Sequence, residues 1–268
     1  MALDKDNYFS EQANMEYLSA SQFKDFMKCE VEALAKIKEP DKPTTAMLIG
    51  SYVDSYFSGE LDTFKEQNPQ IFKKDGTLLK DFEKANEIIQ VIENDDMLME
   101  YLSGEHQVIM TGFISGVPFK IKIDSLLKNI IVDQKIMSSI YNLEWKQDNN
   151  GQWRKVDFVE MFGYDIQGAI YQEIVRQNTG IRMPFVLAVT TKEDNPDKAL
   201  IQIDQYYLDR ALKVVEDNCQ RFDLIKKGVI EPVGCGHCAT CRKDRQVTQV
   251  FSYETLFNKE RNDNEQRD

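Results

Sequence analysis

The strongest constraint on the fold of this chain is the pattern of apolar and charged residues in two neighbouring segments. In residues 119–124, phenylalanine and isoleucine alternate with lysine and aspartate, the period of a β-strand with one buried face. After a short polar break, residues 130–136 are apolar except for Asp133, Gln134 and Lys135. Such a run is typical of a central strand covered on both faces. The two segments therefore predict neighbouring strands at the centre of a sheet.

The charged residues of these two strands predict a metal site. If the strands pair as a hairpin, Asp124 lies next to Asp133, with Lys135 on the same face and Gln134 turned away. Charges on a covered strand are costly unless they are paired or bind a metal ion. Two adjacent carboxylates also repel each other unless a divalent cation lies between them. We therefore favour a metal site over the alternative, a solvated sheet face with Lys–Asp pairs.

Composition sets the size and class of the protein. With 268 residues, 42% of them hydrophobic, the chain can bury one sizeable core with a small helical annex. No apolar run approaches the ~18 residues of a membrane span. Residues 1–7 do not resemble a signal peptide. We expect a cytoplasmic protein with no membrane partner.

The acidic balance of the chain bears on nucleic-acid binding. A net charge of −12 is unfavourable for general attraction to phosphates. Half of this charge comes from residues 81–100, which contain seven acidic residues and a single lysine. We expect this segment to be a solvated helix. Net charge governs bulk association and not a local groove, so a nucleic-acid enzyme is still compatible with this composition.

Hydrophobic periodicity and turn residues divide the rest of the chain into helices and strands. A capping box at Ser19 and Gln22 opens the first helix. We expect helices over residues 19–38, 47–57, 78–92, 156–178 and 206–227, and strands over residues 105–114, 119–124, 130–136, 184–191 and 199–205.

The first three expected strands, within residues 105–136, form a meander. Residues 145–154 are expected to be a surface loop with two tryptophans. These tryptophans either stack on nucleic-acid bases or cap a hydrophobic edge, the commoner use of this residue.

A cluster of cysteines near the C-terminus predicts a metal centre. Cys235, Cys238 and Cys241 are spaced three residues apart, and the absence of a secretion signal argues against disulfides. A loop of this kind holds three thiolates, and the fourth ligand comes from elsewhere. One option is Zn²⁺, completed by His237 or Cys29, and the other is an iron–sulfur cluster. Cys219 lies within a helix and is expected to be a core residue.

The order Asp124, a short hairpin, then Asp133-Gln134-Lys135 resembles the core of the PD-(D/E)XK nuclease superfamily, in particular its RecB/RecE-like branch. The resemblance implies that Asp124 and Asp133 hold Mg²⁺ or Mn²⁺ and that Gln134 contributes its backbone carbonyl. It also implies that Lys135 is the catalytic lysine, which positions the attacking water and offsets charge on the phosphate. The proline that gives the superfamily its name is absent, because Ile123 precedes Asp124.

Two other motifs extend the resemblance. RecB-like nucleases carry Gly-x-x-x-His on a helix before the core, and here Gly50 is followed by Asp54 at the histidine position. Asp54 is then a further metal ligand that favours Mg²⁺ or Mn²⁺; the alternative is an exposed helical aspartate. Gln167 and Tyr171 match a Gln-x-x-x-Tyr helix that borders the substrate channel in this branch.

The cysteines also match a feature of the branch. A subset of RecB-like nucleases joins one N-terminal and three C-terminal cysteines around a 4Fe–4S cluster, which implies that Cys29 joins Cys235, Cys238 and Cys241. The spacing of the last cysteine departs from the commonest form of that subset. The choice between cluster and zinc is therefore left open at this point.

Taken together, the resemblance implies an α/β, restriction-endonuclease-like fold: a central mixed sheet with the catalytic meander, flanked by helices, plus an N-terminal helical segment. We expect a flexible segment at 1–18 and one nuclease domain at 19–257, followed by a disordered tail at 258–268. Within the domain we expect a mainly helical part at 19–104, the catalytic core at 105–205 and a C-terminal helix with the cysteine cluster at 206–257.

The implied function is a metal-dependent DNA exonuclease that hydrolyses phosphodiester bonds at duplex ends in phage-type recombination. Its implied partners are DNA, a single-strand annealing protein and further copies of itself in a ring. One alternative is a catalytically silent DNA-binding or scaffold protein with a structural cysteine site, which would be free to lose Asp133 and Lys135. A second alternative is a helicase-associated or CRISPR-adaptation nuclease.

Overall fold

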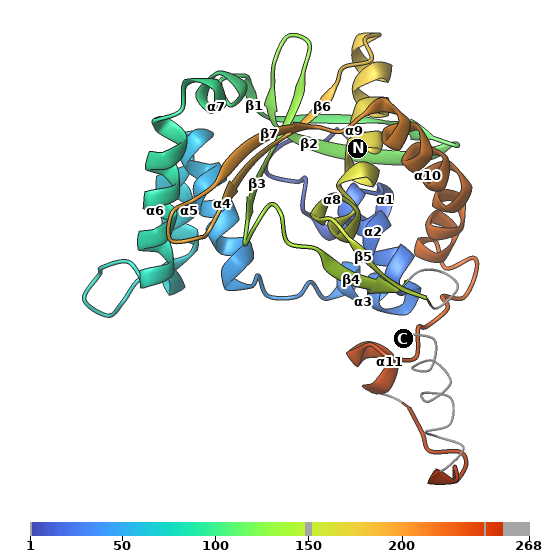
Figure 1. The fold of residues 1–268 in the computed structure, drawn as a ribbon. Helices are drawn as coiled ribbons and strands as arrows, with labels where there is room; N and C mark the ends of the chain where they lie inside the picture. The colour runs from blue at the N-terminus through green and yellow to red at the C-terminus, as the bar shows by residue number, and fades with distance from the viewer. Residues whose placement is uncertain (1, 148–151, 244, 254–268) are drawn as a thin grey trace.

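The computed structural model describes residues 2–147, 152–243 and 245–253. The expected tail at 258–268 lies outside the described residues. At the centre is a five-stranded mixed sheet with the order β1-β2-β3-β6-β7 (Figure 1). The strands are β1 (Glu105–Ile114), β2 (Val117–Leu126), β3 (Ile131–Met137), β6 (Phe185–Thr191) and β7 (Lys198–Gln202).

The first three strands form the predicted meander, since β1–β2 and β2–β3 pair antiparallel. Strands β3 and β6 pair in parallel, and β7 adds antiparallel to β6. Parallel neighbours need a long crossover. Here it contains the hairpin of β4 (Glu144–Gln147) and β5 (Trp153–Val156), then α8 (Phe158–Phe162) and α9 (Tyr164–Thr179).

Helices cover both faces of the sheet (Figure 1). On one side lie α4 (Thr45–Phe57), α5 (Leu61–Gln67), α6 (Lys80–Glu93) and α7 (Asp96–Tyr101), and on the other lie α9 and α10 (Gln205–Lys226). Alternate residues of one strand therefore enter different cores: Ile131 packs in the α9–α10 core, and Val132 packs in the α4–α6 core. This confirms the expectation that β3 is covered on both faces and that the fold is mixed α/β.

The expected helix over 19–38 is two helices, α2 (Ala20–Lys28) and α3 (Glu30–Lys38). The break is at Cys29, whose backbone is extended with φ −162° and ψ 112°. The apolar period continues across the break, and for this reason the sequence pattern predicts one helix. Ser19 caps α2 as predicted, since its side chain accepts the Gln22 backbone N–H.

The segment expected to be flexible is packed against the sheet in the structure. Residues before α2 form helix α1 (Glu11–Glu16), and the backbone of Leu18 pairs with β2 beside Phe119. Two buried lysines hold this segment. Lys120 donates to the Asn14 side chain at 2.7 Å, and Lys226 of α10 donates to the Tyr17 carbonyl at 2.6 Å.

Two further expectations need correction. The helix over 156–178 is divided into α8 and α9 at Gly163, which adopts the left-handed conformation with φ 63° and so ends α8. The two ends of the segment 145–154, expected to be a loop, belong to strands β4 and β5, which pair antiparallel. Residues 148–151 between them lie outside the described part. The remaining elements are η1 (Pro69–Ile71) and α11 (Ala239–Lys243). Among the described residues, no helix is long and apolar enough to cross a membrane.

Candidate active site and four-cysteine centre

The predicted neighbours Asp124 and Asp133 face each other where β2 and β3 separate. The paired residues of this ladder are Leu126–Ile131 and Ser125–Val132, so the next step places Asp124 opposite Asp133. At this step the backbone N–H of Gln134 donates to the Asp124 carboxylate, with 2.9 Å between nitrogen and Oδ2. The Asp124 carboxylate thus takes the place of a backbone carbonyl of β2 as the acceptor for this N–H, and the hydrogen bond orients the Asp124 side chain toward β3.

Asp133 is held from two sides. It is only 2% exposed, and its Oδ1 accepts a 2.6 Å hydrogen bond from Gln167 Nε2 on α9. Its Oδ2 lies in an ion pair with the Lys135 ammonium but has no hydrogen-bond partner. The ion pair compensates the charge of this buried oxygen, as a buried carboxylate requires.

Lys135 is a charged group inside this site. Burial alone would lower the pKa of Lys135, but Asp133 and Asp124 outweigh burial and raise it. Its Nζ also donates to the Gln134 carbonyl at 3.3 Å and lies 5.3 Å from the centre of the Tyr164 ring. The Gln134 carbonyl therefore points to the same side as the lysine.

Asp54 reaches the same site from helix α4. It is half-buried rather than exposed, and Gln107 of β1 donates Nε2 to both of its carboxylate oxygens at 3.1 Å. Burial raises the pKa of Asp54, while Lys122 and Lys135 act against this shift. Asp54 is thus close enough to Lys135 for the lysine charge to affect the pKa of Asp54, which is not expected of an isolated aspartate on the surface.

Nothing in the sequence pattern marks Gln107, a polar residue within a strand. Its backbone has φ 56° although it is not glycine, and it is only 5% exposed. The left-handed conformation is uncommon for such residues and is found disproportionately at functional sites. It turns the Gln107 amide toward Asp54.

The electrostatics of the site fit a divalent cation. The pKa of Asp124 is raised well above its usual range by burial, then by the charges of Asp133 and Asp54. Carboxylate oxygens are the donors that Mg²⁺ and Mn²⁺ prefer. The oxygen atoms of the three carboxylates do not all lie within 4.8 Å of one another. Among the described residues, only the cysteine group has its candidate ligand atoms this close together.

Two cavities meet at this site. The first, of about 520 Å³, is lined by Asp124, Asp133 and Lys135 together with four further lysines, Lys24, Lys36, Lys120 and Lys122. The second, of about 620 Å³, is lined by Asp54, Asp124 and Lys135. Asp124 and Lys135 border both, so the site connects a lysine-rich cavity with a second one.

Gln167 and Tyr171, predicted to border a substrate channel, both line the first cavity. Their polar groups are already engaged. Gln167 holds Asp133, and the Tyr171 hydroxyl donates to the Lys122 carbonyl at 3.0 Å, which ties α9 to β2. The first role of this pair in the structure is thus to fix the strands that carry the carboxylates.

Lys24 of α2 is a site residue without a signal in the sequence. Its ammonium lies 5.5 Å from the centre of the Tyr164 ring, the ring that also faces Lys135. Burial lowers the pKa of Lys24 to about 8, and the charge of Lys135 acts in the same direction. Helix periodicity alone cannot show that α2 faces β3.

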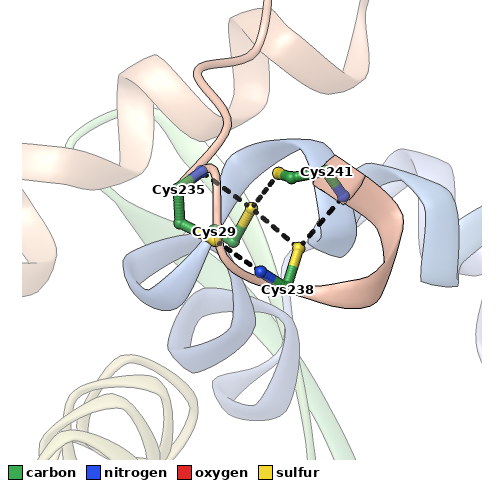
Figure 2. A group of neighbouring side chains, drawn as sticks. All are labelled: Cys29, Cys235, Cys238 and Cys241. Atoms are coloured by element: carbon green, nitrogen blue, oxygen red, sulfur yellow. Dashed lines mark hydrogen bonds between the residues drawn. The ribbon is translucent and has the colours of Figure 1, made fainter. Parts of the chain in front are cut away.

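The four cysteines form a compact group (Figure 2). The Cys29 sulfur lies 3.8 Å from that of Cys238 and 3.5 Å from that of Cys241, and it accepts the Cys235 backbone N–H at 3.4 Å. All four sulfur atoms lie within 4.8 Å of one another. Cys29 occupies the break between α2 and α3, and this break turns its side chain toward the C-terminal loop.

Local contacts favour a thiolate at Cys235. Backbone N–H groups of His237 and Cys238 donate to the Cys235 sulfur and lower the pKa of its thiol to about 6. A Cβ on Gly234 would lie 2.8 Å from the Cys241 sulfur, so only glycine fits there. The His237 side chain is not part of the group, and Cys219 is fully buried in the core, as predicted.

A mixed sheet whose antiparallel meander carries Asp124, Asp133 and Lys135, with helices on both faces, defines the PD-(D/E)XK-like class of protein. The chain belongs to the family described as a PDDEXK-like domain of unknown function (DUF3799), whose model matches residues 19–244. Among curated proteins, no relative matches the chain.

A solved structure agrees with this assignment. The chain is similar to the crystal structure of a protein from Eubacterium rectale that is provisionally called an exonuclease. The two are 46% identical, with a TM-score of 0.89, over 96% of this chain and 98% of the other. The similarity thus covers the nuclease-like core and the segments that carry the cysteines.

Proposed function

We propose that this protein is a metal-dependent DNA nuclease, and that it acts as an exonuclease on linear DNA. The observation that carries the proposal is the meeting of Asp54, Asp124, Asp133 and Lys135 at the junction of a lysine-rich cavity with a second cavity. The exonuclease preference is supported by the similarity to the protein from Eubacterium rectale.

The residues that would hold the metal are Asp54, Asp124 and Asp133, with the Gln134 carbonyl as a further ligand. Mg²⁺ or Mn²⁺, when bound, supplies the activation of water and the polarisation of the scissile phosphate. The neighbouring carboxylates of Asp124 and Asp133, and the raised pKa of Asp124 that their repulsion helps to cause, support a cation at this place.

The side chains of the chain have separate tasks in this proposal. Lys135 is charged and stabilises the negative charge that develops on the phosphate in the transition state. Gln167 and Gln107 fix the orientation of Asp133 and Asp54. Lys24, Lys36 and Lys122, which line the first cavity, neutralise the phosphates of the bound strand, so a local basic surface is present in a chain with a net charge of −12.

Incubation of linear and circular duplex DNA with the protein, with and without Mg²⁺ or Mn²⁺, tests this function on a gel. We expect loss of linear DNA only in the presence of metal, with intact circles. Cleavage of circles would make the protein an endonuclease. No cleavage of either form under any metal would support the silent DNA-binding alternative.

We further propose that the four cysteines hold one metal centre. Their sulfurs are 3.5–3.8 Å apart where the contacts are direct, close to the roughly 3.8 Å expected between thiolates that bind one tetrahedral Zn²⁺ at 2.3 Å. A 4Fe–4S cluster binds each thiolate to a different iron and needs wider spacing, whereas the resemblance favours the cluster, so both centres are candidates. Metal analysis and the visible spectrum of protein purified without oxygen distinguish the two.

The resemblance also implies a role in phage-type recombination, with a single-strand annealing protein and a ring of identical subunits. Sedimentation of the purified protein tests the ring, because a monomer at all concentrations would contradict it. Co-purification with a single-strand annealing protein tests the partner.

A further inference from the structure

The hairpin β4–β5 has two different faces. Its register pairs Trp145 with Lys155 and Gln147 with Trp153. Since opposite residues in an antiparallel pair point to the same side, and every second residue does so along a strand, Trp145, Trp153 and Lys155 share one face. We call these three residues the tryptophan face.

The opposite face is fixed to the protein. Lys146 donates to the Glu160 carbonyl at 2.8 Å, Arg154 donates to the Glu160 carboxylate at 2.7 Å, and Val156 is only 3% exposed. The tryptophan face therefore points outward. Trp145 is 58% exposed and Trp153 is 49% exposed.

About half of each side chain is open to solvent, so neither ring is fully used in covering a hydrophobic edge. Large apolar side chains gathered on a surface mark a binding site more often than single exposed ones. The face is also basic, because Lys155 is exposed and its ammonium lies 5.5 Å from the centre of the Trp145 ring. In a chain with a net charge of −12, such a face is complementary to an anionic partner.

The hairpin is continuous with the candidate active site. Glu144, the first residue of β4, lines the second cavity together with Asp54 and Lys135. Phe162 of the adjoining helix α8 lines the same cavity and is 49% exposed. The second cavity thus borders the hairpin, on the face opposite Trp145 and Trp153.

We propose that the tryptophan face binds single-stranded DNA, with unpaired bases stacked on Trp145 and Trp153 and a phosphate beside Lys155. Bases offer a flat apolar surface and phosphates a negative charge, the combination that this face complements. Duplex DNA hides its base faces, so it does not fit as well. The inference rests on the proposed function, because it names the form of DNA that the nuclease site receives or releases.

The tryptophans themselves report on this interaction. The chain has two tryptophans, and both are on this face, so all of its tryptophan fluorescence comes from it. We expect oligo(dT) to quench the emission of the full-length protein without added divalent metal, and blunt duplex of equal length to quench it less. Raising the salt concentration should weaken the binding.

Variants locate the binding. Trp145→Ala and Trp153→Ala should each weaken oligo(dT) binding about tenfold in fluorescence anisotropy of labelled DNA. Lys155→Ala should lower the slope of log affinity against log salt by about 0.7. The matched control is Tyr206→Ala on α10. Tyr206 is also an exposed aromatic residue beside a cation, because its side chain is 64% exposed and Arg210 lies 5.6 Å from its ring centre. This variant should bind as the wild type does.

Several results would overturn the inference. They are unquenched emission with oligo(dT), stronger quenching by duplex, equal losses in the Tyr206→Ala control, or a dimer in sedimentation that the Trp145→Ala variant abolishes. Cleavage of thymidine 5′-p-nitrophenyl phosphate separates the two proposals. If this small ester is cleaved with metal and the emission is unquenched, only the tryptophan face is refuted. If quenching is seen and neither this ester nor linear DNA is cleaved with metal, the face is supported and the nuclease proposal fails.

Discussion

At the scale of single residues, the carboxylates of the site are oriented by groups outside the Asp–Asp–Lys pattern. Asp124 accepts a backbone N–H, Asp133 accepts the amide of Gln167, and Asp54 accepts the amide of Gln107. Such supporting groups fix the direction of a ligand and thereby set its affinity for metal.

Gln107→Leu tests this role directly. Leucine keeps the volume of the side chain but cannot donate to Asp54, so we expect Mn²⁺ binding to weaken roughly 10- to 100-fold in calorimetric titration. Gln220→Leu, which removes an exposed hydrogen bond to the Ser115 carbonyl, is the control and should leave the affinity unchanged. Equal affinity in Gln107→Leu would remove Asp54 from the metal site.

The pKa of Asp124 predicts a dependence of stability on pH. Because the folded-state pKa is raised by burial and by Asp133, the folded protein binds this proton more tightly than the unfolded chain. In metal-free protein this contribution to stability is therefore fully present below the ordinary carboxyl pKa and is lost as the pH rises through the raised value. Asp124→Asn should remove the loss.

The measurement is the Tm of metal-free wild type and Asp124→Asn between pH 4 and pH 8. The variant should gain in Tm relative to wild type as the pH rises, whereas the exposed Asp41→Asn should follow wild type throughout. A constant difference between wild type and Asp124→Asn would show that this carboxylate is not strained in the fold.

At the scale of elements, periodicity predicted which segments are helices and strands but not where helices break. The alternation in 119–124 and the apolar run in 130–136 specify β2 and β3, because the side-chain period of a strand fixes which residues share a face. The breaks at Cys29 and Gly163 interrupt helices whose apolar pattern continues, so they have no signal in the period.

The same reasoning explains which parts of the site could be predicted. Asp124, Asp133 and Lys135 follow from spacing within two adjacent strands. Lys24 and Gln107 could not be found in this way, because they reach the site from α2 and from a left-handed position in β1. Both depend on how distant elements pack, which the local sequence does not specify.

The contact of α10 with the N-terminal segment predicts a second pH effect. Burial lowers the pKa of Lys226 to about 7, although its ammonium donates to the Tyr17 carbonyl. The folded state thus favours the neutral amine, so stability should rise with pH from about 7 toward the ordinary lysine pKa near 10.4. Below about pH 7 the lysine is protonated in both the folded and the unfolded state, so this contribution no longer changes with pH.

Lys226→Met should flatten this rise, measured as Tm between pH 7 and pH 10. Its neighbour on the same helix, Lys227, forms an ion pair with Asp223, and its side chain is 57% exposed. Lys227→Met is therefore the matched control and should keep the rise. A slope in Lys226→Met equal to that of wild type would show that Lys226 keeps its proton in the fold.

At the scale of the whole molecule, the four cysteines join residues near the two ends of the described chain. Cys29 and Cys238 are 209 positions apart, yet their sulfurs lie 3.8 Å from each other (Figure 2). Closing so long a loop restricts the unfolded chain, and metal binding adds its free energy to folding. We expect the centre to stabilise the whole domain.

Cys29→Ser and Cys238→Ser should therefore lower the Tm of the purified protein by similar amounts. Both variants should also lose the zinc or iron bound by the cysteines. Cys219→Ser, in the core, should keep the metal and change Tm little. Full metal content in Cys29→Ser would exclude a four-cysteine centre and leave a site of three thiolates.

In the proposed function, the junction of β2, β3 and α4 is the catalytic centre of a metal-dependent nuclease. The most direct test compares wild type with Lys135→Ala on linear duplex DNA in Mn²⁺, with circular dichroism to verify the fold. We expect metal-dependent degradation by wild type and a loss of rate on the order of 10²–10³ in the folded variant. Degradation by Lys135→Ala at the wild-type rate would contradict this proposal.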